Sequence, residues 1–243
     1  MKDAQTIENG KVEDTEKETA NSGQTAQSSI ETIQSAMDIS SREQPAISSG
    51  EQVQTSSVYV LVEYRQANLE VASMGMADFI SSANRTKLGE AAASIAEAEG
   101  PILKDVLYKK LFSLFGVGKT NDSVEAADKA IRTAKIKTSK LKGSIICWAS
   151  EQDPKNYYGV RMNPDRHSDE IPLPELSNAL CYVLQEKGSM DSDSLIKEAS
   201  RVLGYKRLGK NLEAALSAGL QYAKSCKVIQ IGKNSSCTLS VHA

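Results

Sequence analysis

The sequence predicts a mainly α protein with small β-hairpins, an α+β fold, and three observations lead to this prediction. First, residues 88–130 recur 88 positions later as residues 176–218, with eleven identities and no gap, where composition alone predicts about three. Second, both copies carry apolar residues at helical spacing, interrupted by glycine. Third, each copy is followed by two short alternating stretches around a turn, as in a hairpin. One supersecondary unit is therefore expected twice.

Residues 1–56 differ in composition from the rest of the chain. They are rich in Ser, Gln, Thr and Glu, contain no aromatic residue, and carry four basic and ten acidic side chains. Such a segment buries too little apolar surface to offset its ordering entropy. We expect a disordered acidic tail of net charge −6, followed by a mildly basic body of net charge +4.

Residues 57–85 are expected to form an extended arm and a lead-in. Val58–Tyr64 is β-branched and aromatic, which is typical of an edge strand, and the pattern over 67–82 is ambiguous.

The first unit is expected over residues 86–149. A helix capped by Thr86 is stopped by Gly100-Pro101, a second helix covers 103–115 and ends at Gly116, and a third, capped within 121–123, runs to about Thr133. Residues 136–138 and 145–148 then form a hairpin.

The second unit is expected over residues 174–243, after a proline-containing linker at 150–173. Its helices are predicted over 174–186, from a cap at Asp191 or Ser192 to Leu203, and over 208–225, with a hairpin from 227–232 and 236–241. Helix, helix, turn, helix, hairpin is the order of a winged helix. The sequence thus predicts two tandem winged helix-turn-helix units.

Several motifs resemble chemical sites without meeting their requirements. Gly116–Thr120 ends like a phosphate-binding loop, but Ser113 stands where the motif needs glycine, and the loop follows a predicted helix. Asp191–Ser194 resembles a calcium loop that lacks its central glycine, so it is interpreted as a helix cap. The four cysteines and two histidines show no zinc spacing. We expect no enzyme activity, no metal and no cofactor.

The remaining constellation is basic. In the second unit, candidate nucleic-acid contacts lie at the turn, along the third helix and at the hairpin tip: Lys206, Arg207, Lys210, Asn211, Lys224 and Lys233. In the first unit they are Lys119, Lys129, Arg132 and Lys135, with Lys137, Lys140 and Lys142 along the hairpin. Lysine and arginine at such positions neutralise phosphates, and Asn211 can reach a base edge. The alternative is an ordinary solvated surface.

Aromatic and arginine residues gather in the linker: Tyr157, Tyr158, Arg161 and Arg166. They can stack on bases or anchor the linker between the two units, and anchoring is favoured.

Several segments resemble the family called domain of unknown function 3320. They are Ile95–Ile102, the Phe-Gly end of the second helix, Trp148, Glu170–Leu176 and Ser194–Arg207, and the resemblance spans roughly residues 59–239. It implies a winged-helix module found at the C-terminus of large superfamily-one helicase-like proteins, often beside a restriction-endonuclease-like nuclease domain. Such a module has no catalytic residue of its own. The chain lacks the helicase motor and the nuclease, so it is either a free-standing accessory subunit or a detached piece.

The expected function is a non-catalytic DNA-binding or substrate-positioning module of a helicase or nuclease system. The alternative is a protein-interaction module that docks on a helicase or nuclease partner. No apolar run is long enough to span a bilayer and no export signal is recognised, so a cytoplasmic protein without membrane contact is expected.

Overall fold

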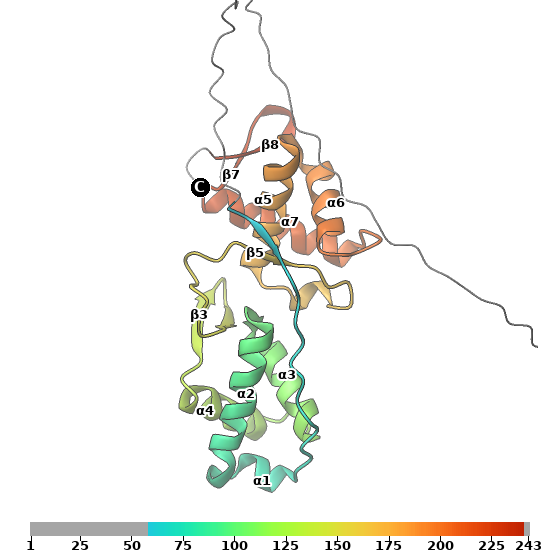
Figure 1. Cartoon of the computed structure of the whole chain (residues 1–243). Helices are drawn as coiled ribbons and strands as arrows, with labels where there is room; N and C mark the ends of the chain where they lie inside the picture. The colour runs from blue at the N-terminus through green and yellow to red at the C-terminus, as the bar shows by residue number, and fades with distance from the viewer. Residues whose placement is uncertain (1–57, 241–243) are drawn as a thin grey trace, which may run out of the picture. The chain divides into compact units, whose positions relative to one another are not determined.

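The computed structural model describes residues 58–240, and the predicted acidic tail at 1–56 lies outside them. The described chain is α+β, as the sequence predicts, with seven α-helices, three short 3₁₀ helices and three small sheets among these residues. Figure 1 labels the seven α-helices and several of the strands. We describe an N-terminal arm (residues 58–75), a first half (76–148), a connecting segment (149–172) and a second half (173–239).

The first half contains four α-helices and a three-stranded sheet. In chain order the elements are α1 (Met76–Ile80), α2 (Arg85–Glu99), β2 (Ile102–Leu103), α3 (Lys104–Phe115), α4 (Asn121–Thr133), β3 (Lys137–Leu141) and β4 (Ser144–Trp148). Strands β3 and β4 form the predicted hairpin. The two-residue strand β2, which the sequence did not predict, pairs antiparallel with β4 and gives the order β2-β4-β3.

The second half repeats this arrangement. Its elements are α5 (Leu173–Lys187), β6 (Met190–Asp191), α6 (Ser192–Val202), α7 (Lys210–Ser225), β7 (Ile229–Ile231) and β8 (Ser236–Leu239), with sheet order β6-β8-β7. Helix α5 begins 88 positions after α2, β6 begins 88 after β2, and α6 begins 88 after α3. The structure therefore confirms the duplicated order at the same offset.

Residues at the helix ends explain part of the similarity between the two halves. Gly116 ends α3 in the left-handed conformation, with φ of +67°, and Gly204 follows α6 with φ of +95°. Asp191 caps α6 by accepting a hydrogen bond from the Ser194 amide at 2.9 Å, as predicted.

Two predicted caps are wrong. Helix α2 begins at Arg85, before Thr86, and its N-cap residue Asn84 makes no side-chain capping bond. Helix α4 is capped by Thr120, whose hydroxyl accepts from the Ser123 amide at 3.1 Å, while the Ser123 hydroxyl accepts from the Thr120 amide. This reciprocal capping box places the cap one residue before the predicted 121–123 window.

Each half has its own hydrophobic core. Equivalent leucines of the repeat are buried in both, with Leu88 and Leu107 in the first half and Leu176 and Leu195 in the second. The predicted apolar stripes thus mark the helix faces that pack inward.

The N-terminal arm contacts both halves. Its strand β1 (Val60–Val62) pairs in parallel with β5 (Gly159–Arg161) of the connecting segment, where the sequence predicted no strand. The side-chain amide of Gln185 donates to the Tyr59 carbonyl and accepts from the Tyr59 amide, both at 3.0 Å. Farther along, the amides of Ala72 and Met74 donate to the carbonyls of Leu114 and Phe115 at 3.0 Å.

Candidate nucleic-acid interface

The turn between α6 and α7 presents the densest group of predicted contact residues. Lys206, Arg207 and Lys210 are all exposed, and none lies within 4.0 Å of a carboxylate among residues 58–240. Gly209 is the N-cap residue of α7 and has no side chain that could cap the helix. The first amides of this 16-residue helix therefore stay uncapped, and they lie next to the three cations. The positive end of the helix dipole adds to their charge.

A loop of the connecting segment borders the start of α7. Residues 164–168 and the first turn of α7 line a groove that contains Arg207, Lys210 and His167. A neighbouring groove places Asn211 beside Asp169 and Glu170, of which Glu170 forms an ion pair with Lys109 at 3.4 Å. Asn211 is thus exposed but faces an acidic segment, whereas the turn before α7 is basic.

Lys224 and Lys233 are exposed at a distance from this group. Lys224 lies in the last turn of α7, about 21 Å along the helix axis from Lys210. Lys233 lies in the 3₁₀ turn (Lys233–Ser235) between β7 and β8, at the tip predicted for the second hairpin. The six predicted residues of the second half therefore form one dense group and two outlying lysines.

The predicted residues of the first half have different surroundings. Lys119, Lys129, Arg132 and Lys135 are exposed, but Lys129 forms an ion pair with Glu125 at 2.6 Å. Helix α4 also carries Asp122 and Asp128, and α1 packs against it. From Gly116 to Thr133 there are three basic and three acidic residues, whereas the equivalent residues 204–221 include three basic and one acidic. The equivalent stretch is therefore neutral in the first half and +2 in the second.

The Gly116–Thr120 segment is a turn between two helices. It follows α3 and leads into the cap of α4, with Lys119 exposed. A phosphate-binding loop follows a buried strand, so the structure agrees with the interpretation of this segment as a connection.

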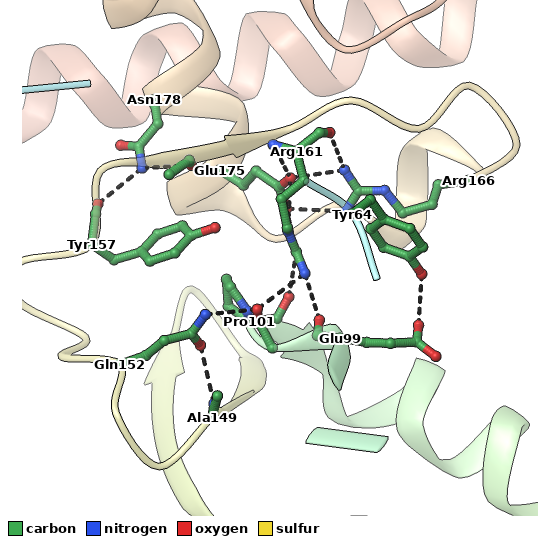
Figure 2. Close-up of polar contacts among 12 residues, drawn as sticks. Tyr64, Glu99, Pro101, Ala149, Gln152, Tyr157, Arg161, Arg166, Glu175 and Asn178 are labelled. Atoms are coloured by element: carbon green, nitrogen blue, oxygen red, sulfur yellow. Dashed lines mark hydrogen bonds and ion pairs between the residues drawn. The ribbon is translucent and has the colours of Figure 1, made fainter. Parts of the chain in front are cut away.

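A buried ionic cluster, formed by Arg161, Arg166 and Glu175, joins the connecting segment to the second half (Figure 2). Glu175, in the first turn of α5, is fully buried, and each of its oxygens accepts from both guanidinium groups. The shortest contacts are 2.6 Å from Arg161 Nη2 and 2.8 Å from Arg166 Nη2. The Arg161 amide also donates to Glu175 at 3.0 Å. This two-sided geometry provides the hydrogen bonds that a buried carboxylate requires.

Arg161 extends the cluster into the first half. It donates to the carbonyls of Glu99, Gly100 and Pro101 at 2.5, 3.1 and 2.7 Å (Figure 2). The buried Glu99 carboxylate accepts from the Tyr64 hydroxyl at 2.6 Å, and it pairs with Lys110 at 3.0 Å. Arm, first half, connecting segment and second half thus meet at one polar junction. Arg161 and Arg166 are buried here, which supports anchoring and not base stacking for these two residues.

These contacts shift the pKa values of the Glu175 carboxyl and the Tyr64 hydroxyl. Burial opposes ionisation of Glu175, but Arg161 and Arg166 outweigh it and hold the pKa of its carboxyl below the ordinary value. The pKa of the Tyr64 hydroxyl is raised by burial and by its hydrogen bond to Glu99. Glu175 therefore stays charged in the folded protein.

Burial also raises the pKa of the Cys147 and Cys181 thiols, to about 11 in each case. Such thiols are protonated at neutral pH and are poor nucleophiles. Within residues 58–240, no three or more His, Cys, Asp or Glu side chains lie together as a metal site requires. In the same residues, no helix has both the length and the apolar character needed to cross a bilayer.

The sequence interpretation missed the role of Glu175, although its position gives a signal. Glu175 lies four residues before Ala179 and eight before Val183, both buried, so the helical spacing places its carboxylate on an inward face. A charged residue on a buried face needs a partner, and Arg161 and Arg166 stand just upstream in the chain.

Comparison with known proteins gives one match. Residues 77–126, about a fifth of the 243, match the model of a family described as "Protein of unknown function (DUF3320)", over a narrower stretch than the expected 59–239. No curated protein and no solved structure matches the chain. The chain thus carries, over α1 to the start of α4, a segment similar to this family.

Proposed function

We propose that this chain is a non-catalytic DNA-binding module built from two winged-helix units, in which the second half carries the main contact surface. The proposal of winged helices is supported by the order helix, strand, helix, helix, hairpin in both halves, and by the sheet orders β2-β4-β3 and β6-β8-β7. In such a unit the third helix enters the major groove, and this position belongs to α7 in the second half.

One observation carries the choice of ligand. Lys206, Arg207 and Lys210 stand exposed around the start of α7 without a carboxylate partner within 4.0 Å among the described residues. Elsewhere in the same residues, some cations pair with carboxylates, among them Lys104, Lys110 and Lys129, and others such as Lys119, Lys140 and Lys142 do not. The group at the start of α7 differs from both because three such cations lie within five residues of one another. Unpaired cations around one helix start favour a polyanion, because they neutralise phosphates and release counterions.

The biological setting we propose is an accessory, substrate-positioning role in a helicase or nuclease system. Support comes from the resemblance to domain 3320 proteins and from the family match over residues 77–126. ATP hydrolysis is not part of the proposal, since the Gly116–Thr120 turn lacks the surroundings of a phosphate-binding loop.

The test is fluorescence anisotropy with a labelled 20-base-pair duplex and the matching single strand, between 50 and 200 mM salt. We expect affinity for the duplex to fall steeply with salt. The variant K206Q/R207Q/K210Q should lower the slope of log K against log salt by about two to three, since each lost phosphate contact removes about 0.9.

The matched control is K87Q/K155Q/K197Q, which removes the same charge from three exposed lysines elsewhere. It should change affinity and slope much less. Binding that is absent, insensitive to salt, or equally weakened by both triple variants contradicts the proposal.

A second candidate function is docking on a helicase or nuclease protein, and one observation favours it. Helices α1 and α4 form a groove in the first half that combines apolar Ile80, which is 44% exposed, with Arg85, Asp122 and Glu125. An apolar centre with a polar rim is typical of protein interfaces. If the purified chain binds no DNA, this groove becomes the primary surface, and I80E should abolish retention of the chain by a helicase or nuclease partner.

A further inference from the structure

The hairpin of the first half reaches α7 of the second half. Lys142, at the β3–β4 turn, places its ammonium nitrogen 5.9 Å from the centre of the Tyr222 ring. Lys142 and Gly143 both have positive φ, +44° and +89°, as in a tight two-residue hairpin turn that projects its tip. A cation over an aromatic face is a favourable contact, so the Lys142–Tyr222 contact places the hairpin tip beside α7.

The contact lies on the same helix as the basic group of the second half. Tyr222 follows Lys210 by 12 positions, which is about 18 Å along the axis of α7. Between them the exposed side chains of α7 are Asn211, Glu213, Ala214, Ala218 and Gln221. At 3.6 residues per turn, Ala214, Ala218 and Gln221 lie on the side of α7 that runs from Lys210 to Tyr222. Glu213 lies on the other side of Lys210, so this acidic group stands beside the path to the hairpin tip and not on it.

The lysines near the hairpin tip are free to contact an anion. Lys140 and Lys142 are exposed and have no carboxylate within 4.0 Å among the described residues. Lys137 is different, because its ammonium donates to the carbonyls of Ser150 and Gln152 at 2.8 and 2.7 Å. Strand alternation places Lys140 on the opposite face of β3 from Lys137.

We propose that the first-half hairpin and α7 bind one and the same DNA duplex, with Lys140 and Lys142 contacting its phosphates. The inference rests on the proposed DNA-binding function and extends it to a composite surface made by both halves. About 18 Å along a duplex corresponds to roughly five base pairs, so one continuous duplex can reach Lys210 and Lys142 together.

The first experiment measures the salt dependence of binding to the 20-base-pair duplex. We expect K140Q/K142Q to weaken binding about fivefold to tenfold at 100 mM salt and to lower the salt slope by about one to two. K140R/K142R, which keeps both charges, should restore binding. K155Q/K197Q is the charge-matched control and should behave like the wild type.

The second experiment asks whether both surfaces hold the same duplex. In a Cys226→Ser background, which removes an exposed thiol, Lys142→Cys carries a photo-crosslinker and should attach to the duplex at one DNA per chain. Addition of K206Q/R207Q/K210Q should remove most of this crosslink. A crosslinker at Lys155→Cys should give little product.

The outcomes separate the two claims. If the duplex binds with normal salt dependence but K140Q/K142Q changes nothing and Lys142→Cys does not crosslink, the composite surface is wrong and the proposed function stands. If two duplexes bind per chain, or the crosslink persists without the α7 contacts, the surfaces act separately and the inference is overturned. If no duplex binds, both claims fail. Circular dichroism melting of each variant verifies folding.

Discussion

Helices α4 and α7 occupy the same place in the duplicated order but differ in surface chemistry. Both follow a left-handed glycine, Gly116 or Gly204, and α4 packs on α2 as α7 packs on the equivalent helix α5. Residues 116–133 around α4 are electrically neutral, and Lys129 there is paired with Glu125, whereas the equivalent residues 204–221 have two more basic than acidic residues. The two halves share their buried leucines and not their charges. The repeat is therefore maintained in the packed core, while the surface charge of its two copies differs.

The buried cluster of Arg161, Arg166 and Glu175 holds the two halves together. Breaking this cluster should have the largest effect on the stability of the protein. Glu175→Gln leaves Arg161 and Arg166 buried without their carboxylate. We expect a loss of about 3–5 kcal/mol in the free energy of unfolding, measured by urea denaturation. Glu125→Gln, which breaks the exposed pair with Lys129, is the control and should change the free energy of unfolding far less.

The same variant gives a test by pH. Because the pKa of Glu175 is lower in the folded than in the unfolded protein, its contribution is present above the unfolded pKa of about 4.3. It is lost as pH falls through the folded pKa. The wild type should therefore lose stability below about pH 4.3 more steeply than Glu175→Gln, and equal acid dependence would contradict this account.

The two left-handed glycines test how similar the halves are in backbone detail. Alanine at either position is strained by about 1–2 kcal/mol because φ is positive. At Gly204 an added Cβ would also lie 3.0 Å from Met162 Cγ and 3.1 Å from Pro164 Cδ, whereas at Gly116 the nearest atom is Ser73 Oγ at 3.3 Å. Gly204→Ala should therefore destabilise more than Gly116→Ala in thermal and urea unfolding. Gly118→Ala, with no atom within 4 Å, is the control, and an equal cost at Gly116 and Gly204 would show that crowding is unimportant.

A charge change in α4 should have the smallest effect and sharpens the comparison directly. If acidic residues keep α4 from contacting DNA, Asp122→Lys with Glu125→Lys should tighten duplex binding roughly threefold to tenfold. The salt slope should rise by about one to two. Anisotropy measures both, with Glu151→Lys plus Asp153→Lys as the charge-matched control. An equal gain from the control would show a general charge effect.

Local pattern predicted much of the fold. The spacing of Leu176, Leu180 and Leu184, the stop at Gly100 and the alternation around Lys142-Gly143 led to helices and hairpins that the structure contains. Strands β2, β5 and β6 were missed because two or three residues show no readable period. Their partners lie far away in the chain, and only the assembled core specifies them.

In the candidate site too, local features could be predicted from the sequence and contacts between distant segments could not. Exposure of Lys206, Arg207 and Lys210 follows from a turn and a polar helix face, and the Glu125–Lys129 pair follows from its spacing of four residues. The contact of Lys142 with Tyr222 and the binding of Arg161 to the carbonyls of residues 99–101 join segments distant in the chain. No local pattern encodes such contacts.

The hydrogen bonds between the Gln185 side-chain amide and the Tyr59 backbone also bear on self-association. The Val60 amide donates to the Tyr158 carbonyl, so the backbone groups of Val60 and Val62 face β5, and those of Tyr59 and Leu61 face outward. Gln185 occupies the outward groups of Tyr59, which leaves Leu61 as the sole outward-facing residue within β1. One residue is too short a template for an incoming strand. The apolar edge of β1 is thereby shielded from the strand-by-strand growth that leads to aggregates.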